Sequence, residues 1–423
     1  MKTLIPFKEA LQTVFSNIGA NEPEEISVFD SLGRVASKDV ASRSSFPALS
    51  TAAVDGFAIK ISRGGGENSP LEVVDTTYTG DKASEVQGGA VKVSTGAFIP
   101  SWANAVIMKE FVDEKNGKIF FNKKVNGVNE WENVNRAGSI FSPGEVIVKK
   151  GTLIDSGIVG LLCSVNKTKL EVFKKPSVAV IATGNEIAEP GSENPLKVPN
   201  SSAHIVVSSA LECGAEVTYL GIVEDDKEQL KSELKDAVEH FDLVVTTGGV
   251  SVGDVDLLPK IMKDIGVKPL FWKVLQKPGK PVLFGKTLRG AYLGIPGYPT
   301  SAATVAEVYL KGILRKMQGI DPFFTVDAEV AADYSRNPRK RTELARCRLF
   351  FEKGELKLKI LPNQTSANPK SFANANGLAI LEPEKEKISA GETLQAIPKW
   401  NLKRATVFDI AEHGSGGKKE DRF

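Results

Sequence analysis

The sequence predicts a multidomain protein of the α/β plus β class, with a doubly wound parallel-sheet domain, an inserted small β-rich domain, a mixed linker domain and a C-terminal β-barrel. Its 423 residues are too many for one hydrophobic core. Between residues 177 and 318, short β-branched runs alternate with turns and amphipathic helical segments, which is typical of a parallel sheet covered by helices. Residues 71–121 instead carry short strand-like runs separated by glycine-rich turns. Residues 324–330 and 356–360 alternate apolar and polar residues, which is typical of half-buried antiparallel strands.

The predicted domain boundaries follow changes in this pattern. The β-rich segment interrupts two stretches of mixed character, the second of which has Asp155 as a suitable N-cap for an apolar helix over residues 157–165. We therefore expect the β-rich segment to be inserted between two halves of one linker domain. A polar, glycine-rich tail is expected to be partly disordered. The predicted domains are residues 1–40 with 137–173, 41–136, 174–319 and 320–400, followed by the tail 401–423.

The composition limits the classes of partner and the compartment. Lys and Arg number 54 against 52 Asp and Glu, so the net charge of +2 gives no reason to expect a nucleic-acid partner. Three widely spaced cysteines favour neither a disulfide framework nor a zinc site and suit a reducing cytoplasm. No apolar run approaches the roughly 18 residues of a membrane span, and residues 1–6 lead into an amphipathic helix rather than a signal sequence. We expect a cytoplasmic protein with no membrane partner.

The α/β domain brings three turns to one edge of its sheet. Strands are predicted over residues 177–183, 216–220 and 243–245. Helices are predicted over residues 202–213, after an N-cap at Asp225 or Asp226, and over residues 300–318. Ligands bind beyond the carboxyl ends of the strands in such sheets. The turns at that edge span residues 183–186, 248–256 and 294–301, and their convergence predicts a ligand site.

The second of these turns combines glycines with carboxylates. Gly248, Gly249 and Gly253 let the backbone adopt positive φ and approach a ligand, and successive N–H groups in such a turn form an anion site. Asp254 and Asp256 follow directly. One interpretation is that a divalent cation joins these two carboxylates to a phosphate. The other, which the spacing favours equally, is that Asp254 simply caps the helix that follows.

Basic residues occur in two further segments. Lys277 and Lys280 lie on a turn in which two prolines restrict the backbone, so a phosphate or other oxyanion site is favoured over a solvated surface turn. Arg341 and Arg346 are five residues apart and would face opposite sides of a regular strand. At most some of the arginines in this segment can therefore serve one site.

Two motifs in the β-rich segment leave alternatives open. Asp55-Gly56 signals a turn, and Asp55 is either part of an ordinary hairpin or an acid, base or metal ligand in a cleft. Residues 95–100 follow a predicted strand, and their amides either face a ligand or close a corner. The corner is favoured on the sequence alone.

Together the motifs resemble one family, the molybdopterin molybdenumtransferases, represented by MoeA in prokaryotes and by the E domain of gephyrin. Each matching stretch is weak alone, but their order and spacing are specific and extend to about Lys399. The stretches are Val54–Ala58, Ser94–Ala97 with Pro100, Ala103–Val106 with Glu110, Thr183–Glu186, Gly248–Asp256, Lys277–Pro281, Ile295–Pro299, Arg341–Arg346 and Ala373–Gly377.

The resemblance implies an α/β domain of the molybdopterin-binding type and an elongated homodimer, with the linker domain taking part in dimerisation. The α/β domain of one subunit would face the β-rich module of the other. The implied reaction inserts molybdate into adenylated molybdopterin and releases AMP, with Mg²⁺ as cofactor. The adenylyltransferase and the recipient molybdoenzymes are the implied transient partners.

The resemblance also assigns roles to individual residues. The catalytic residues would be Asp55, Asp256, Lys277 and Lys280, and the metal ligands would be Glu186, Asp254 and Asp256. Molybdate would lie at Lys280, Pro281, Arg341 and Ser366. Asp55 and residues 95–97 would reach in from the partner subunit. The pterin and AMP would contact Thr95, Gly96, Ala97, Thr183, Gly184, Gly248, Gly249, Ser251, Gly253, Pro296 and Gly297.

Four positions depart from the family pattern. Tyr298 stands where asparagine is usual, Asn200 and Ser202 replace an aspartate and an asparagine, and Ala52 replaces a common serine. These departures affect the expected pterin contacts more than the cation site, and tungstate is an alternative to molybdate. Two other functions compete: a molybdopterin adenylyltransferase, whose fold resembles residues 175–318 alone, and a non-catalytic scaffold of the same fold.

Overall fold

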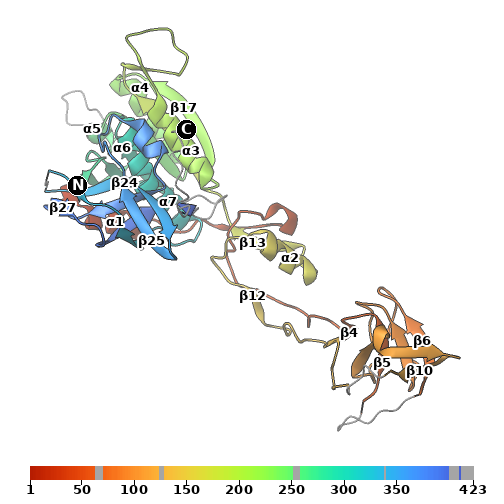
Figure 1. Cartoon of the computed structure of the whole chain (residues 1–423). Helices are drawn as coiled ribbons and strands as arrows, with labels where there is room; N and C mark the ends of the chain where they lie inside the picture. The colour runs from red at the N-terminus through yellow and green to blue at the C-terminus, as the bar shows by residue number, and fades with distance from the viewer. Residues whose placement is uncertain (62–69, 123–127, 251–257, 338–339, 400–408, 411–423) are drawn as a thin grey trace.

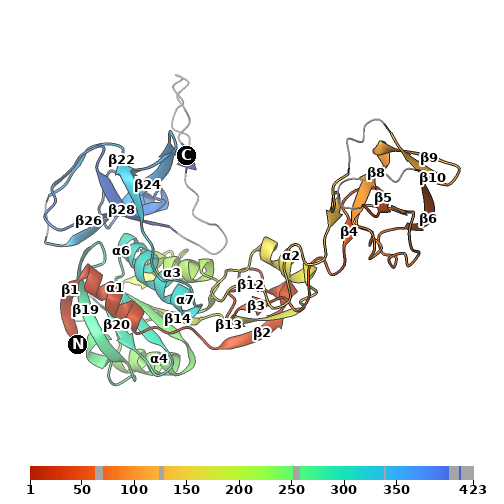
Figure 2. The same cartoon turned by 90° about the horizontal axis from the view of Figure 1, so that it is seen from below.

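The computed structural model describes residues 1–61, 70–122, 128–250, 258–337, 340–399 and 409–410. The chain is elongated (Figures 1 and 2). The α/β domain and the C-terminal barrel form one lobe, a narrow stalk leads away from it, and the β-rich module lies at the far end.

The predicted parallel sheet forms the centre of the α/β domain. Strands β17, β14, β18 and β21 run parallel in that order, and β18 and β21 are buried along their whole length. β20 pairs antiparallel with β21, and β19 pairs antiparallel with β20. The strands are β14 (Ser177–Thr183), β17 (Glu216–Val223), β18 (Leu243–Thr247), β19 (Lys268–Lys277), β20 (Leu283–Lys286) and β21 (Ala291–Ile295).

Helices cover both faces of this sheet, because the two sides of each buried strand need apolar partners. On one face α3 (Ser201–Glu212) packs with α6 (Pro299–Val305), and on the other α4 (Lys227–His240) packs with α5 (Leu258–Ile261). Asp226 is the N-cap of α4 and accepts a hydrogen bond from the Gln229 amide at 2.8 Å. Asp225, the other predicted cap, does not cap this helix.

The helix predicted over residues 300–318 is not regular throughout. Between α6 and α7 (Lys311–Met317) the chain forms a π-helical turn, η3 (Ala306–Leu310). All five residues of this turn are buried. A π-helical turn adds one residue to the helical repeat, and such turns are frequent at functional sites.

The N-terminal segment packs on the α/β domain. β1 (Lys2–Pro6) pairs in parallel with β19, and α1 (Phe7–Ser16) buries Phe7, Ala10 and Val14 in the core beneath the sheet. This packing differs from the predicted assignment of residues 1–40 to the linker domain. The difference arises because β1 pairs with a strand far along the chain, which the local pattern does not reveal.

The stalk is made of two short strand pairs and one helix. β2 (Pro23–Ser27) pairs with β13 (Lys169–Phe173), and β3 (Val40–Ala41) pairs with β12 (Val146–Val148); the short 3₁₀ helix η1 spans Val28–Asp30. Asp155 caps α2 (Ser156–Ser164), as predicted, accepting from the Ile158 amide at 2.9 Å. Leu162 alone is fully buried in this apolar helix.

The β-rich module contains a sheet in the order β8, β5, β7, β6, β10, β9, which confirms an inserted β-rich unit. Its strands are β5 (Gly56–Ile59), β6 (Leu71–Thr77), β7 (Ala90–Val93), β8 (Ala105–Met108), β9 (Val112–Lys115) and β10 (Lys118–Phe121), with the 3₁₀ helix η2 (Lys109–Phe111) and the pair β4 (Thr51–Ala52) and β11 (Val134–Asn135).

The last part of the chain closes into the predicted barrel. β24, β25, β22, β28 and β26 pair in sequence, and β26 pairs back onto β24. β24 also pairs with β19, which joins the barrel to the α/β sheet at Gln276 opposite Thr342 and Lys277 opposite Glu343. The remaining elements are β15 (Ile187–Ala188), β16 (Val198–Pro199), β22 (Val326–Val330), β23 (Tyr334–Ser335), β24 (Thr342–Glu352), β25 (Glu355–Ile360), α8 (Pro369–Ala373), β26 (Gly377–Leu381), β27 (Lys387–Ile388), β28 (Thr393–Pro398) and β29 (Asp409–Ile410).

Two expectations from the composition concern the whole chain. Among the described residues, no helix combines the length and the apolar character that crossing a membrane requires. Cys163, Cys213 and Cys347 are free thiols, and the last two are buried.

Candidate functional site

A cleft of about 550 Å³ opens at the carboxyl edge of the parallel strands. The three turns that the sequence brought to this edge all contribute to it. The predicted site residues that line the cleft are Thr183, Gly184, Glu186, Gly248, Gly249, Pro281, Pro296 and Gly297. Further lining residues include Asn200, Ser202, Asp225, Tyr298 and Ala367, of which Asn200, Ser202 and Tyr298 are positions where the sequence departs from the family pattern.

Glycine is required in the floor of the cleft because the turns pack backbone against backbone. Gly248 has φ of +92°, and a Cβ atom there would lie 2.4 Å from the carbonyl oxygen of Thr183. At Gly184, with φ of +139°, a Cβ atom would lie 2.6 Å from a carboxylate oxygen of Glu186. Any side chain at Gly248 would therefore push the first two turns apart.

Two helices begin at the cleft. Asn200 caps α3 by accepting from the Ala203 amide at 3.3 Å, and the Ser202 hydroxyl donates to the Gly297 carbonyl at 2.6 Å. Pro299, in the wall of the cleft, is the first residue of α6. The N-terminus of a helix carries partial positive charge and unpaired N–H groups. The cleft is therefore suited to an anionic ligand.

Carboxylates supply the oxygen donors of the cleft. Glu186 and Asp225 both line it, and Asp225 is linked to Asn185 through a hydrogen bond from its own amide to the Asn185 side chain at 3.0 Å. Four predicted site residues, Ser251, Gly253, Asp254 and Asp256, lie outside the described residues. Within the described part of the chain, no group of three or more His, Cys, Asp or Glu is placed to hold a metal.

The turn at residues 277–281 has its two lysines in different environments. Lys277 pairs with Glu343 at 2.8 Å, and Glu343, only 3% exposed, also receives Arg336 at 2.9 Å. Burial raises the pKa of Glu343, but the hydrogen bonds from Lys277 and Arg336 outweigh it and hold that pKa below its usual value. The Lys277 ammonium is thus already paired with a carboxylate of the barrel, which it shares with Arg336. Lys280 makes no ion pair with any residue that the structure describes.

The barrel brings a loop to the cleft. Arg346 is fully buried and donates to the Ser371 hydroxyl at 3.1 Å and to the carbonyls of Asn363 (3.3 Å) and Thr365 (3.1 Å). These bonds fix the loop in which the predicted Ser366 precedes Ala367, a lining residue of the cleft. Arg346 therefore has a structural role, whereas Arg341 directly precedes Thr342, the partner of Gln276 in the β19–β24 pair.

Asp55 and its neighbours form a separate site on the β-rich module. One carboxylate oxygen accepts from the Thr95 amide and hydroxyl, both at 2.8 Å, and the other accepts from Lys109 at 3.1 Å. The Thr95 bonds, assisted by Lys109, lower the pKa of Asp55 to about 2. Gly96 and Ala97 follow Thr95 in this corner. The stalk separates the corner from the cleft (Figures 1 and 2), so one chain does not bring the two sites together.

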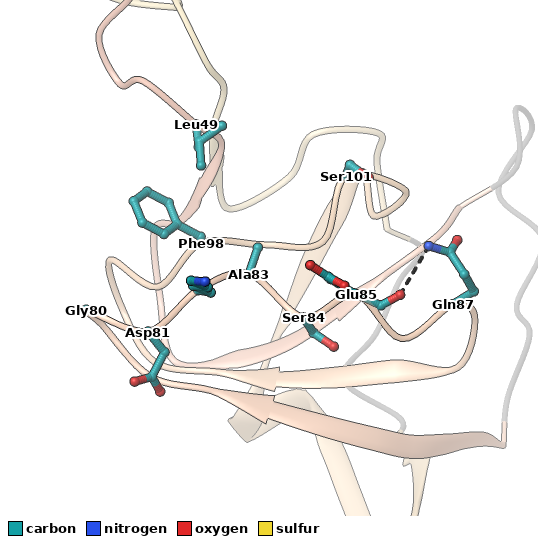
Figure 3. A pocket seen from close by; sticks show the side chains of 10 residues that line it. Leu49, Gly80, Asp81, Ala83, Ser84, Glu85, Gln87, Phe98 and Ser101 are labelled. Carbon is teal, nitrogen blue, oxygen red and sulfur yellow. Dashed lines mark hydrogen bonds between the residues drawn. The ribbon is translucent and has the colours of Figure 1, made fainter.

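A second hollow, of about 490 Å³, lies on the β-rich module and is shown in Figure 3. Its wall is the loop from Gly80 to Glu85, faced by Leu49, Phe98 and Ser101. It contains none of the predicted site residues.

Comparisons with known proteins show which family the chain resembles. Three family models match the chain: "MoeA N-terminal region (domain I and II)" over residues 5–166, "Probable molybdopterin binding domain" over 179–316 and "MoeA C-terminal region (domain IV)" over 328–399. A molybdopterin molybdenumtransferase of Bacillus subtilis (strain 168) is 30% identical over 407 residues, which are 94% of each chain. The chain belongs to the molybdopterin molybdenumtransferase family.

Other members of the molybdopterin molybdenumtransferase family match over similar lengths. That of Staphylococcus epidermidis (strain ATCC 12228 / FDA PCI 1200) is 32% identical over 411 residues, 94% of this chain and 96% of its own. The crystal structure of a molybdopterin biosynthesis MoeA protein from Pyrococcus horikosii superposes with a TM-score of 0.80 at 28% identity, covering 94% of this chain and 100% of that one. The predicted family and fold class are confirmed, and the role of each residue stays a prediction.

Proposed function

We propose that this chain inserts molybdenum from molybdate into adenylated molybdopterin and releases AMP. The cleft supports this proposal best, because glycine turns and the N-termini of α3 and α6 converge on one hollow. Backbone N–H groups and helix N-termini stabilise anions. The pterin phosphate, the adenylate and molybdate are all anions, and the cleft has room for more than one group.

The chemistry expected of the protein is positioning and charge stabilisation rather than covalent catalysis. The sulfur ligands of the product come from the pterin, so no protein thiol is required. Lys280 and Arg341 would neutralise the tetra-oxo anion next to Pro281 and Ser366, while Lys277 holds the turn to the barrel through Glu343. Fixed charges in a partly enclosed site stabilise developing charge without reorganising at the moment of reaction.

The donor set suits Mg²⁺, which prefers carboxylate oxygens and substrate phosphates. Glu186 and Asp225 line the cleft, and the sequence adds Asp254 and Asp256 directly after the glycine turn. We assign the metal to Glu186, Asp254 and Asp256, where it would neutralise phosphate charge. Asp225 is a further carboxylate that lines the same cleft as Glu186.

A homodimer would complete the site. The stalk exposes large apolar side chains, Phe29 at 75% and Leu32 at 67%, beside the apolar helix α2. Burying these groups between two stalks would remove them from water. In such a dimer the Asp55 and Thr95 corner of one subunit would face the cleft of the other. Transient contacts with the adenylyltransferase and with molybdoenzymes fit the same function.

The assay uses the purified chain with adenylated molybdopterin, Mg²⁺ and molybdate, and measures released AMP and pterin-bound metal. We expect AMP release that requires both the oxyanion and Mg²⁺. A parallel reaction with tungstate determines which metal is preferred. Consumption of ATP without preformed adenylated molybdopterin would instead identify an adenylyltransferase. Full function of the Asp256→Ala variant would indicate a non-catalytic scaffold.

A further inference from the structure

Gln276 is a buried polar side chain at the base of the 277–281 turn. It has no exposed surface, and both ends of its amide are hydrogen bonded. Its Nε2 donates to the carbonyl oxygens of Pro278 at 3.3 Å and Gly279 at 3.1 Å, and its Oε1 accepts from the Tyr309 hydroxyl at 2.6 Å. The two carbonyls require the NH₂ group on their side, which fixes the orientation of the amide.

Tyr309 orients this glutamine from the π-helical turn η3. Its ring is fully buried and packs edge-on against Phe7, with the ring centres 6.5 Å apart and the planes at 85°. Burial holds the pKa of Tyr309 well above its usual value, so the hydroxyl stays protonated and remains a donor. The irregular turn of the helix therefore supplies a fixed donor to Gln276.

These bonds also determine where the backbone N–H groups of the turn point. In a trans peptide the C=O and N–H groups point in opposite directions. The 278–279 and 279–280 peptides are not among the cis bonds of the described chain. Since the carbonyls of Pro278 and Gly279 face Gln276, the amides of Gly279 and Lys280 face away from it. Within the described residues neither amide donates a hydrogen bond. Two successive outward N–H groups form a nest that binds anions.

The 277–281 turn also packs against helix α6. Gly279 has φ of +82°, and a Cβ atom there would lie 2.6 Å from a methyl carbon of Val305 on α6. The turn therefore lies directly on this helix, and Gln276 links it to the next helical turn through Tyr309. Pro281, at the end of the turn, lines the cleft.

We propose that Gln276 and Tyr309 are positioning residues that aim the Gly279 and Lys280 amides, together with the Lys280 side chain, at the bound tetra-oxo anion. This inference rests on the proposed function and adds a backbone anion nest to the oxyanion site. The recognised group is a tetrahedral oxyanion such as molybdate or tungstate. Neither residue touches the anion, since both act through the turn.

The test compares Gln276→Met with Gln318→Met. Gln318 is also buried, and its Nε2 donates to two carbonyls, those of Cys213 and Leu314, both at 3.0 Å. Its partner Cys213 is the C-cap of α3, whereas the cleft is at the N-terminus of that helix. Both variants lose two amide–carbonyl hydrogen bonds, so both should have a lower Tm. Only the Gln276 variant should alter oxyanion binding.

The expected result is a KM for molybdate raised about tenfold to a hundredfold in Gln276→Met, with the Kd for adenylated molybdopterin unchanged. Tyr309→Phe keeps the ring and removes only the donor, so it should raise this KM less, about three- to tenfold. Calorimetric titration with molybdate should show the same order in the Kd, with the larger increase in Gln276→Met and the smaller one in Tyr309→Phe. Gln318→Met should change neither constant more than about twofold.

The inference and the proposed function can fail separately. Normal AMP release by the wild-type chain with an unchanged molybdate KM in Tyr309→Phe and Gln276→Met would show that the pair only stabilises the fold. If Gln276→Met does not fold, Tyr309→Phe alone decides. Absence of AMP release from the wild-type chain would overturn the proposed function itself.

Discussion

A lysine pairs with a carboxylate in two regions of the molecule, at the 277–281 turn beside the cleft and in the Asp55 corner of the β-rich module, but the two pairs are built differently. Lys277 and Glu343 lie 2.8 Å apart with side chains 29% and 3% exposed. Lys109 and Asp55 lie 3.1 Å apart with side chains 58% and 49% exposed. The buried pair joins two domains, whereas the exposed pair presents a carboxylate on an open surface.

This difference separates structural from functional roles. Removing one partner of a buried pair is strongly destabilising because it leaves an uncompensated charge away from water. An exposed pair contributes little to stability because water and salt screen it. Asp55 is nevertheless held by three hydrogen bonds. An ordered but exposed carboxylate is what a half-site awaiting a second surface would present.

The largest effect on stability should come from Glu343→Gln. It leaves the Lys277 and Arg336 charges without their buried partner, so we expect a loss of about 3–5 kcal/mol in the free energy of unfolding. Urea unfolding of the lobe formed by the α/β domain and barrel measures it. The control is Glu382→Gln in the same lobe, whose carboxylate lies 3.1 Å from Lys8 but is 57% exposed. An equal loss of unfolding free energy in both variants would contradict the contrast between the buried pair and the exposed pair.

Asp55→Asn should reduce activity without reducing stability. We expect AMP release to fall about 10²- to 10³-fold with no measurable change in the unfolding curve, because the side chain is exposed and the Asn oxygen still accepts from Thr95. The measurement is steady-state AMP release beside thermal unfolding. Wild-type turnover in Asp55→Asn would show that the corner is only a structural turn.

Gly248→Ala tests the packing of the cleft floor. Its Cβ atom would meet the Thr183 carbonyl at 2.4 Å, whereas at Gly266 of the same domain, with φ of +80°, nothing lies within 4 Å. Both substitutions place alanine at positive φ, so each should cost about 1 kcal/mol, and Gly248→Ala should cost about 1–3 kcal/mol more. Comparison of the two unfolding midpoints isolates the clash. Equal midpoints would mean that the turns can separate freely.

The smallest effects should appear in the pH dependence. The pKa of Glu343 is below its usual value in the folded state, so its stabilising contribution is complete above its unfolded pKa and is lost as pH falls through the lower, folded pKa. The stability difference between wild type and Glu343→Gln should therefore narrow only in acid. Asp55, with a pKa of about 2, should remain ionised across the assay range. A limb in the pH–activity profile near pH 4–5 that disappears in Asp55→Asn would contradict this.

Much of the cleft could be predicted because its signals are local. Glycines before carboxylates, a capping residue before a helix and prolines around a lysine turn each reflect backbone constraints within a few residues. The choice between Asp225 and Asp226 as the cap of α4 could not be made locally, because both can accept from the first turn. In the structure Asp226 caps and Asp225 lines the cleft.

The contacts missed by the sequence analysis are those between distant segments. β19 was not predicted, and its pairing with β1 and β24 could not have been, since nothing near residues 268–277 specifies those partners. The Gln276–Tyr309 bond depends on the same strand and on the π-helical turn within a segment predicted as regular helix. Polar residues at core positions, Gln276 and Arg346, were the signals that could have indicated buried networks.

Mixing two inactive variants tests the central claim most directly, namely that one working site is built from the Asp55 corner of one subunit and the cleft of another. Asp55→Asn and Lys280→Met chains, each inactive alone, are co-expressed with different tags to allow random pairing. Half of the dimers should then be mixed, each with one intact site, so AMP release should return to about a quarter of the wild-type rate per chain. No recovery in purified mixed dimers would show that both residues serve a site within one chain, or none at all.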